Sequence, residues 1–323
     1  MQAIVLHKTG DSDVLKIEKN YPDPKCEADE VVVKHNAIGV NFFDISFRRG
    51  QYKTSKSPLI LGFEASGVVA EIGSNVNEYK VGDRVAYATG PYGAYCEKRA
   101  IHKHHLIPLP NEISDAQAAA VLAKGLMTHA LLHRVYIAKR AKRILVHAAA
   151  GGVGHLLCQW AKSMGIEVIG TVGHEAKVNF AQSFGCAHVI NYKEKDFVEE
   201  LSQITNHEGV GLVYDGVGKD TLEKSLHCLW PMGICVSYGE ASGSTEKVDL
   251  DLLAINSLYL TRPTLALYKS NRVELTLSAR EVFAAVTQGI LKPKITTFNF
   301  SDVQKAHQAM ENREIIGSCI LTL

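Results

Sequence analysis

Short runs of β-branched and other apolar residues, each followed closely by a turn, characterise the first third of the chain. Residues 31–34 and 65–72 are two such runs, and glycine, proline and asparagine punctuate the sequence around them. Short strands with frequent glycine turns predict a compact barrel or sandwich rather than alternating strands and helices. An alanine-rich stretch over 115–123 then follows Ser114, a suitable helix N-cap. We therefore expect a β-rich N-terminal part that ends in a helix.

From residue 143 onward, apolar runs of strand length alternate with helical runs whose apolar residues recur every three or four positions. The predicted strands are 143–150, 167–171, 188–190, 211–214 and 233–238, and the predicted helices are 155–164, 176–184, 196–205 and 221–229. Such alternation is typical of an α/β fold with a doubly wound parallel sheet. The tail beyond residue 263 contains a further predicted helix around 273–288 and a strand at 318–323. We expect this tail to return to the N-terminal part.

Length and composition set limits on what the protein can be. The chain has 323 residues, which suggests about two domains. Its 46% hydrophobic and 21% charged residues are typical of a globular protein. Lys and Arg number 35 against 34 Asp and Glu, for a net charge of +1. This balance does not create the positive field of a dedicated nucleic-acid-binding protein, so we do not expect nucleic acid as the main partner.

The cysteines and the hydropathy profile favour a cytoplasmic protein. The 7 cysteines are scattered and odd in number, which fits neither a disulfide framework nor a cysteine-rich zinc lobe. Reduced thiols in a cytoplasm are the simplest interpretation. The apolar run at the N-terminus is too short for a signal peptide. No uncharged apolar stretch of about 18 residues occurs, so no membrane span is expected.

A glycine-rich turn between a predicted strand and a predicted helix is the strongest chemical signal. Residues 149–154, Ala-Ala-Gly-Gly-Val-Gly, form a variant of the G-x-G-x-x-G dinucleotide motif. Gly151 lets the backbone approach a pyrophosphate, and Gly154 allows close packing of helix on sheet. The following helix offers its N-terminal N–H groups to the phosphates. An ordinary tight turn is the alternative, but the strand before and the helix after favour dinucleotide binding by Ala150, Gly151, Gly152, Val153 and Gly154.

The residues after the second predicted strand favour NADPH over NADH. An NAD site usually carries a carboxylate there, for the ribose 2′-hydroxyl. Residues 171–173 are Thr-Val-Gly instead, and His174 and Lys177 follow, which could neutralise a 2′-phosphate. Glu175 is evidence to the contrary, although it lies past the strand end. The alternative for Lys177 is a solvated lysine with no ligand.

Several motifs along the whole chain together identify a family. The chain resembles the zinc-independent NADPH:quinone oxidoreductases, the zeta-crystallin-like group of the medium-chain dehydrogenase/reductase superfamily. The segments that carry the resemblance are 41–44, 62–69, 81–85, 124–126, 148–154, 213–215 and 261–263. The resemblance implies a GroES-like substrate domain over 1–124, completed by 263–323, and a Rossmann NADPH-binding domain over 125–262. It also implies a homodimer, typically paired through the edges of the Rossmann sheets.

The resemblance also implies which residues contact the cofactor. Beyond the glycine turn, the implied contacts are Gly173, Lys177, Tyr192, Tyr238, Gly239, Arg262 and Arg313. Lys124 is a further candidate: it contacts a phosphate or ribose, or it packs its aliphatic stem at the edge of its domain. Met127 and Ala130 depart from the Thr and Tyr usual in relatives. These two departures bear on substrate preference and not on the reaction class.

Zinc chemistry is not expected. Asn41 and Phe63 occupy the places that resemble the Cys and His zinc ligands of the superfamily's alcohol dehydrogenases. An amide and a phenyl ring cannot replace a thiolate and an imidazole on zinc. Two groups of histidines, at 129 and 133 and at 102, 104 and 105, are interpreted as packed or solvated side chains rather than metal sites.

Without a Lewis acid, the substrate should accept hydride readily, as quinones and activated enones do. The resemblance implies that Asn41 and Tyr52 line the substrate and nicotinamide end, so either is a candidate to stabilise the resulting oxyanion, while solvent delivers the proton. For Tyr52 the alternative is a surface tyrosine. For Glu64 and Asp44 we favour structural hydrogen bonding over acid–base catalysis. Two rival functions stay open: reduction of α,β-unsaturated carbonyl compounds, and an NADPH-retaining binding protein of the crystallin type.

Overall fold

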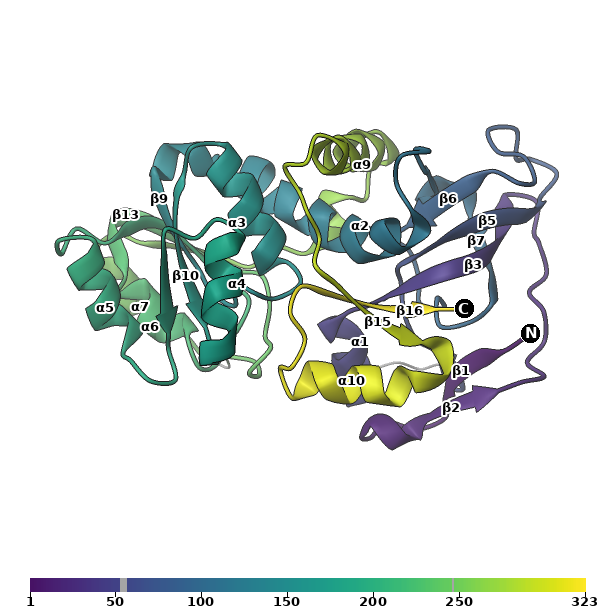
Figure 1. Ribbon diagram of the computed structural model, residues 1–323, viewed down its shortest axis with the longest axis horizontal. Helices are drawn as coiled ribbons and strands as arrows, with labels where there is room; N and C mark the ends of the chain where they lie inside the picture. The colour runs from purple at the N-terminus through teal and green to yellow at the C-terminus, as the bar shows by residue number, and fades with distance from the viewer. Residues whose placement is uncertain (53–56, 246) are drawn as a thin grey trace. The chain divides into compact units, whose positions relative to one another are not determined.

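The computed structural model describes residues 1–52, 57–245 and 247–323. These residues form two compact units (Figure 1). Unit 1 consists of Met1–Lys124, Lys269–Thr287 and Pro293–Leu323. Unit 2 consists of Gly125–Tyr268 and Gln288–Lys292. The sequence-based division differs in one respect, because it assigned all of 263–323 to the first domain. The structure groups 263–268 and 288–292 with unit 2. In the second of these segments the Lys292 backbone N–H donates to Gln159 Oε1 of the same unit at 2.7 Å.

Unit 1 is mostly antiparallel β-structure, as the short apolar runs predict. A 7-stranded sheet has the order β15-β16-β3-β5-β6-β8, with β7 also paired to β3, and a 3-stranded sheet has the order β2-β1-β4. The strands are β1 (Ala3–Leu6), β2 (Leu15–Glu18), β3 (Glu30–Val40), β4 (Leu59–Ile60), β5 (Ala65–Ile72), β6 (Arg84–Tyr87), β7 (Lys98–His102), β8 (Ile107–Pro108), β15 (Ile295–Asn299) and β16 (Ser318–Thr322). The run predicted at 31–34 is therefore part of a longer strand.

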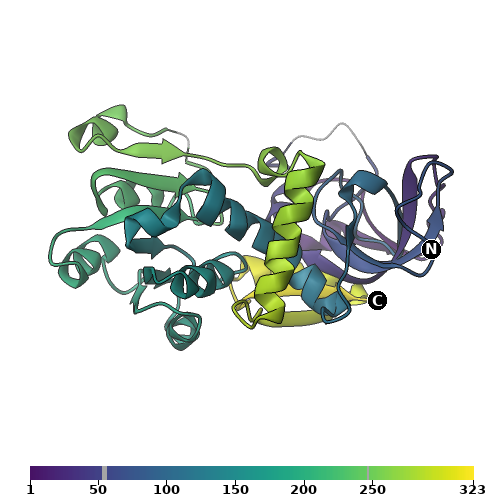
Figure 2. The ribbon, with the colours of Figure 1, turned by 90° about the horizontal axis from the view of Figure 1, so that it is seen from above.

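Helices and the C-terminal tail complete unit 1. Its helices are α1 (Phe42–Arg48), α9 (Arg272–Thr287, the long light-green helix of Figure 2) and α10 (Val303–Glu311), together with the first part of α2 (Asp115–Ala130). The tail returns as predicted, because β16 pairs antiparallel with β3 from Cys319 opposite Val40 to Thr322 opposite Ala37. Residues from β1, β3, β5, α10 and β16 share one apolar core.

Unit 2 is built on a 6-stranded parallel sheet in the order β11-β10-β9-β12-β13-β14. Its strands are β9 (Arg143–Val146), β10 (Glu167–Val172), β11 (His188–Asn191), β12 (Val210–Asp215), β13 (Leu229–Ser237) and β14 (Tyr259–Thr261). Its α-helices, besides the end of α2, are α3 (Gly154–Ser163), α4 (Val178–Ser183), α5 (Phe197–Ile204), α6 (Leu222–Leu226), α7 (Leu250–Ile255) and α8 (Leu265–Tyr268). This strand order is the doubly wound Rossmann order, so the predicted fold class is confirmed.

Three predicted boundaries in unit 2 are wrong, and the backbone there is irregular. The strand predicted at 143–150 ends at Val146, because Ala148 has a φ of 52°, which lies outside the extended region. The helix predicted at 221–229 ends at Leu226, and β13 begins at Leu229 rather than at residue 233. β13 continues through Met232, whose φ is 62°, and its pairing with β12 shifts register near its start. Irregular backbone of this kind leaves no periodic signal in the sequence.

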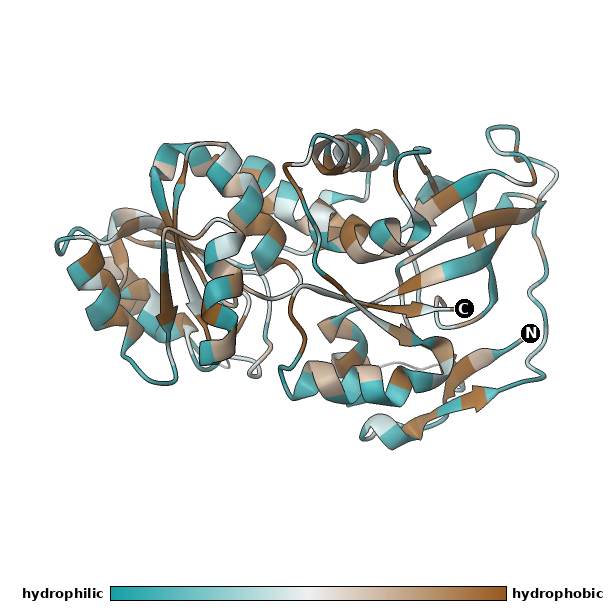
Figure 3. Cartoon of the chain, in the orientation of Figure 1, coloured by the Kyte–Doolittle hydropathy of each residue, from teal (hydrophilic) through white to brown (hydrophobic). Residues whose placement is uncertain are grey.

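Burial in unit 2 follows the hydropathy of its elements. All six residues of β12 are buried, as a strand covered on both faces requires. Figure 3 shows brown, apolar colouring along the central strands and alternating colours on the surrounding helices. Cys158 is fully buried, with its Sγ 3.5 Å from the Sγ of Cys186. In the described part of the chain, no helix combines the length and the hydropathy needed to cross a bilayer.

Candidate functional site

One edge of the unit 2 sheet gathers most of the predicted cofactor contacts. Because all strands are parallel, their carboxyl ends meet at one edge. The glycine turn follows β9, Gly173 follows β10, Tyr192 follows β11 and Tyr238 follows β13. The strand order reverses between the neighbouring strands β9 and β12, because β10 and β11 follow on one side of this pair and β13 and β14 follow on the other side. That point is the topological switch point at which open α/β sheets bind dinucleotides.

The glycine turn is a tight bend in which α3 lies close to the end of β9. The Gly151 N–H donates to Ala148 O at 2.8 Å, and the Ala149 N–H donates to Thr171 O on β10 at 3.0 Å. A Cβ on Gly154 would lie 2.1 Å from Ala148 O, whereas one on Gly151 would lie 3.1 Å from the same atom. Gly154 is therefore required by helix–turn packing. With α3 beginning at Gly154, the turn has the form of a pyrophosphate cradle.

Two buried histidines support this turn, and the sequence reasoning missed both. His155 Nδ1 donates to Gly151 O at 2.8 Å, and its ring lies 5.3 Å from that of Phe184. His147 hydrogen-bonds to Thr171 Oγ1 at 2.8 Å and to Ser225 Oγ at 2.9 Å. Burial lowers the pKa of His147, so the neutral ring is favoured. With 14 histidines in the chain, only tertiary structure separates these two from the rest.

The segment after β10 carries the predicted 2′-phosphate residues. His174 Nδ1 accepts from the Ala176 N–H at 3.2 Å and so caps the 3₁₀ turn Glu175–Lys177. Lys177, at the end of this turn, is half-buried. The Glu175 carboxylate accepts from Asn191 Nδ2 at 3.4 Å. Glu175 therefore has a structural partner on β11. This contact weakens the argument that Glu175 is the ribose-binding carboxylate of an NAD site.

The ends of β12 and β13 are held together by a buried carboxylate and by small residues. Asp215 accepts from the N–H groups of Val217 at 2.8 Å and Gly218 at 3.0 Å, and from Thr221 Oγ1 at 2.8 Å. A Cβ on Gly216 would lie 2.7 Å from the Tyr238 ring. The absence of a side chain at Gly216 therefore lets the phenol lie against the loop. Burial raises the pKa of Tyr238, so its hydroxyl stays protonated.

Three further predicted cofactor residues are divided between the two units. Arg262 is exposed at the end of β14 and forms an ion pair with Glu240 at 2.5 Å. Arg313 belongs to unit 1, where it follows α10 with a φ of 60°. Lys124 is also in unit 1, buried, with its Nζ 3.1 Å from Glu64 Oε2. On α2, Met127 is half-buried and Ala130 buried.

In unit 1, a hydrogen-bond network fixes the predicted acceptor residue Asn41. Asn41 is the N-cap of α1, and its backbone N–H donates to Asp44 Oδ2 at 2.8 Å. Its side-chain Nδ2 donates to Glu64 Oε2 at 3.0 Å. Glu64 also accepts from the Ala123 N–H at 2.6 Å and from Lys124 Nζ at 3.1 Å. These contacts support the interpretation that Glu64 and Asp44 form structural hydrogen bonds. They also place Lys124 in the same hydrogen-bond network as Asn41.

Asp44 is fully buried in this network. Besides the Asn41 backbone, it accepts from Tyr95 Oη at 3.1 Å, and Tyr95 in turn contacts His307 Nε2 at 3.0 Å. Burial, with a smaller contribution from the nearby Glu64 charge, raises the pKa of Asp44 to about 7. Burial lowers the pKa of His307 to about 3. Structural hydrogen bonding of Asp44 was predicted, but its partner Tyr95 and the link through His307 to α10 have no signal in the sequence.

Tyr52 is not an isolated surface tyrosine. Its ring centroid lies 4.7 Å from that of Phe43 and 5.0 Å from that of Phe47. The ring of Phe63 lies 5.8 Å from Phe43, and that of Tyr92 lies 4.2 Å from Phe47. We call these five side chains, Phe43, Phe47, Tyr52, Phe63 and Tyr92, the aromatic patch.

The residues at the superfamily's zinc-ligand positions do not fit zinc. The Asn41 amide nitrogen is a hydrogen-bond donor to Glu64, and the Phe63 ring packs against other rings. Within residues 1–52, 57–245 and 247–323, no group of three or more His, Cys, Asp or Glu side chains has an arrangement that could hold a metal ion. His129 and His133 have ring centroids 5.0 Å apart, and both pack against Trp160.

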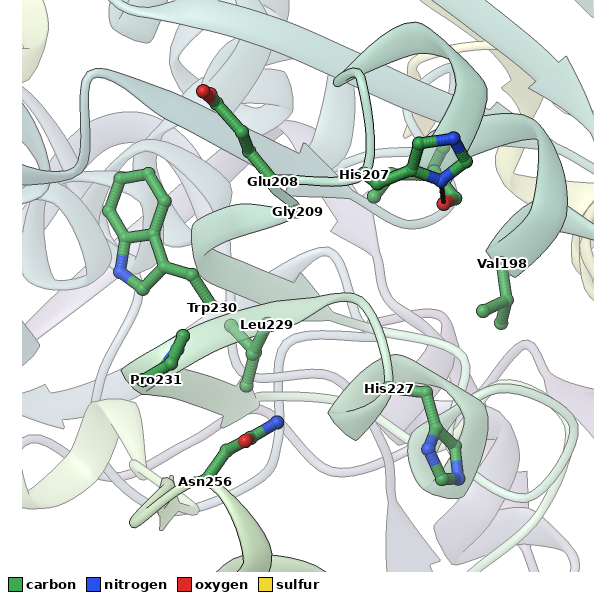
Figure 4. A pocket seen from close by; sticks show the side chains of 11 residues that line it. Val198, His207, Glu208, Gly209, His227, Leu229, Trp230, Pro231 and Asn256 are labelled. Atoms are coloured by element: carbon green, nitrogen blue, oxygen red, sulfur yellow. Dashed lines mark hydrogen bonds between the residues drawn. The ribbon is translucent and has the colours of Figure 1, made fainter.

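A cavity of about 270 Å³ opens at the opposite edge of the unit 2 sheet (Figure 4). It is lined by residues that precede or begin β12 and β13, among them His207, Gly209, Leu229 and Trp230. Parallel sheets bind dinucleotides at the carboxyl ends of their strands, and this cavity lies at the amino ends. We therefore do not assign the cofactor to it.

Comparison with known proteins identifies the family. Residues 27–111 match the family model of the alcohol dehydrogenase GroES-like domain, and residues 152–282 match that of zinc-binding dehydrogenase. Quinone oxidoreductase 1 of Escherichia coli (strain K12) is 42% identical over 322 residues, which cover 98% of each chain. The 2-haloacrylate reductase of a Burkholderia species is 39% identical over 332 residues, covering 99% of this chain and 98% of the relative.

Solved structures agree with these sequence relationships. The crystal structure of Escherichia coli quinone oxidoreductase complexed with NADPH superposes with a TM-score of 0.97 at 41% sequence identity, covering 100% of both chains. The resemblance found in the sequence is thereby confirmed. The chain belongs to the quinone oxidoreductases of the medium-chain dehydrogenase/reductase superfamily.

Proposed function

We propose that this protein is an NADPH-dependent oxidoreductase that reduces quinones by hydride transfer without a metal ion. The observation that carries the proposal is the carboxyl edge of the unit 2 sheet. A glycine cradle at the switch point lies there with Gly173, Tyr192 and Tyr238 after the neighbouring strands. The fold and family match a quinone oxidoreductase whose structure contains NADPH.

On this proposal, unit 2 residues bind the cofactor, which when bound supplies the hydride. The turn formed by Ala150, Gly151, Gly152, Val153 and Gly154 receives the pyrophosphate, because its backbone can approach closely and α3 begins there. Lys177 neutralises the 2′-phosphate, with His174 beside it. Further contacts in unit 2 come from Gly173, Tyr192, Tyr238, Gly239 and Arg262. Two other proposed contacts, Lys124 and Arg313, belong to unit 1.

Unit 1 residues stabilise the acceptor. As hydride adds to a quinone, negative charge develops on a carbonyl oxygen, and one proton completes the hydroquinone. The Asn41 amide and the Tyr52 hydroxyl are proposed to donate hydrogen bonds to that oxygen. Glu64 orients the amide through its 3.0 Å hydrogen bond. Solvent supplies the proton, so no paired carboxylates are needed.

The second candidate function is reduction of small α,β-unsaturated compounds. The likeness to a 2-haloacrylate reductase at 39% identity favours it. Both reactions add hydride to an activated acceptor and use the same cofactor site. The ratio of kcat/KM for a naphthoquinone to that for a series of enones separates the two functions.

The test is an oxidation assay of NADPH and of NADH against a series of quinones, with and without a chelator. We expect turnover with NADPH, slower turnover with NADH, and no change on chelation. Loss of activity with the chelator would contradict metal-free catalysis. Tight NADPH binding measured by calorimetry, without turnover of any acceptor, would favour the binding-protein alternative. No binding of NADPH by the folded protein would overturn the proposal.

We also propose a homodimer formed through β14. This strand ends the sheet order, and among the described strands it pairs only with β13. Apolar side chains are exposed beside this edge, with Tyr259 62% exposed and Ile255 74% exposed. A second copy could extend the sheet and cover them. Sedimentation of the wild type as a dimer and of Tyr259→Glu as a monomer is expected; a monomeric wild type contradicts the proposal.

A cytoplasmic location is the remaining proposal. Its support is the state of the cysteines, all seven of which are free thiols, six of them buried. Reduced thiols are typical of cytosolic proteins. Fractionation of the source cells, with immunodetection of the protein in the cytosolic and membrane fractions, tests it.

A further inference from the structure

His147 follows β9 inside unit 2, and its side chain is fully buried. Its backbone N–H donates to Tyr214 O on β12 at 3.0 Å. Its ring nitrogens lie 2.8 Å from Thr171 Oγ1 on β10 and 2.9 Å from Ser225 Oγ on α6. The ring also meets that of Phe197 on α5 edge to face, with centroids 4.9 Å apart. This one residue therefore joins β9 to two further strands and two helices.

The hydrogen-bond partners of His147 stand next to three loops at the carboxyl edge of the sheet. The glycine turn begins directly after His147, and Gly173 follows Thr171 by two residues. The Ser225 hydroxyl lies 3.4 Å from Asp215 Oδ2, and the Asp215 carboxylate in turn accepts from two N–H groups of the loop after β12. Because the His147 side chain is fully buried, it can act on a ligand only through these three loops.

Hydrogen-bond counting gives each bond of the ring a direction. The neutral imidazole has one N–H donor and one lone-pair acceptor. Ser225 has a single hydroxyl hydrogen, which donates to Thr221 O at 2.8 Å. Ser225 Oγ therefore accepts from His147 Nε2–H, which leaves Nδ1 to accept from the Thr171 hydroxyl. The ring is thus satisfied at both ends, and it fixes the distance between β10 and α6.

From this geometry we propose that His147 is a positioning residue for the cofactor site. It holds the glycine turn, the Gly173 loop and the loop after β12 at a fixed spacing, and in this way it increases the affinity for NADPH without touching the cofactor. The inference rests on the proposed function, because it assumes that these three loops receive NADPH. Loops that are already spaced for the ligand lose less conformational entropy when it binds.

The first test removes one end of the link. Thr171→Val deletes the hydroxyl and retains the branched shape of the side chain. We expect the Kd of NADPH, measured by calorimetry, to rise about three- to tenfold. In the quinone assay the KM for NADPH should rise, while kcat and the KM for quinone change less than about twofold.

Thr205→Val is the matched control. It also removes a fully buried hydroxyl of unit 2, one that donates to Leu201 O at 2.8 Å after α5 and outside the three loops. It should lower the Tm, measured by circular dichroism, about as much as Thr171→Val does, and it should leave the Kd of NADPH unchanged. An unchanged Kd in Thr171→Val, or an equal rise in both variants, would overturn the proposal.

A double-mutant cycle tests whether the effect passes through His147. His147→Phe keeps a planar ring and removes both side-chain hydrogen bonds. In that background, Thr171→Val should raise the Kd of NADPH less than about 1.5-fold further, because the link is already broken. If His147→Phe does not fold, Ser225→Ala takes its place in the cycle, since it breaks the other end of the link. Independent, additive effects would overturn the proposal.

The inference and the proposed function fail in different ways. If NADPH binds but no quinone is turned over, the proposed quinone reduction fails, and the Kd values of the variants still decide the role of His147. If quinones are turned over and Thr171→Val behaves like Thr205→Val, the function stands and the positioning role is overturned. No binding of NADPH by the folded wild type overturns both.

Discussion

The cofactor side and the acceptor side of this protein are built in opposite ways. In the proposed cofactor site of unit 2 the backbone is the main component, since Gly154 and Gly216 leave no room for a Cβ. In the proposed acceptor site of unit 1 side chains are the main component, because Asn41 is held by Glu64 and the aromatic patch comes from separate stretches of chain. A backbone site tolerates little change at a few positions. A site made of side chains can change its substrate preference when its aromatic residues are substituted, while the fold is retained.

The most damaging change should be at the glycine turn. In Gly154→Ala the new Cβ would lie 2.1 Å from the Ala148 carbonyl oxygen, a backbone atom that cannot rotate away. Overpacking of this kind costs about 3 kcal/mol, which is roughly a hundredfold in an equilibrium constant. We expect a lower Tm, measured by circular dichroism, and weaker NADPH binding, measured by calorimetry.

Gly151→Ala is the matched control for that variant. Its Cβ would lie 3.1 Å from the same oxygen, so a shift of a few tenths of an ångström suffices. We expect a clearly smaller effect on Tm. Equal effects of the two substitutions would show that the close approach at Gly154 is not what the turn requires.

Lys177→Gln should change cofactor preference without changing the fold. Loss of a charge-assisted hydrogen bond to the 2′-phosphate predicts an increase of about tenfold in the Kd of NADPH, with the Kd of NADH unchanged. Lys195→Gln, at an exposed lysine paired with Glu200, is the control. If both cofactors are weakened equally, Lys177 does not read the phosphate.

Tyr52→Phe tests the proposed acceptor residues in unit 1, and its expected effect is smaller than that of Lys177→Gln. The ring contacts with Phe43 and Phe47 are retained, and only the hydroxyl is lost. Removing one donor to the developing oxyanion predicts a fall of about fivefold in kcat/KM for quinone, with an unchanged Kd for NADPH. Tyr21→Phe, elsewhere in unit 1, serves as the control. Unchanged kcat/KM in Tyr52→Phe would remove this hydroxyl from the mechanism.

Asp44→Asn should affect the pH dependence of stability more than activity. The pKa of Asp44 rises from its usual 3.8 to about 7 on folding, so between these values the folded protein holds a proton that the unfolded chain releases. The contribution of Asp44 to the free energy of unfolding therefore decreases as pH rises through this window.

The variant cannot lose that proton. Its free energy of unfolding relative to wild type should therefore increase from pH 4 to pH 7, by at most about 1.4 kcal/mol per pH unit. Urea denaturation at several pH values measures this difference. The low pKa of His307 has the opposite pH dependence, but it is common to both proteins. A difference that does not vary with pH would contradict burial of a neutral Asp44.

Sheet topology explains the positions of the predicted cofactor residues in unit 2, whereas no such rule explains how the aromatic patch in unit 1 is assembled. Alternating strands and helices imply parallel strands, and their carboxyl ends must then meet at one edge. Residues at those ends, such as Gly173 and Tyr238, are brought to one edge by topology alone. Phe43, Phe63 and Tyr92 meet only because non-adjacent segments fold together in unit 1. Only Tyr52 of the patch was predicted as a site residue, and that prediction came from resemblance rather than spacing.

By itself, the sequence determined the fold class, the glycine cradle and the membership of the family, because local periodicity and glycine placement act over short stretches of chain. Tertiary structure alone decided which polar groups are buried and which rings meet. It placed His147 and His155 beside the glycine turn, and it buried Asp44 of α1 in a network that reaches His307 of α10 through Tyr95. Burial and long-range contact depend on the whole packed chain, so no local pattern of residues encodes them.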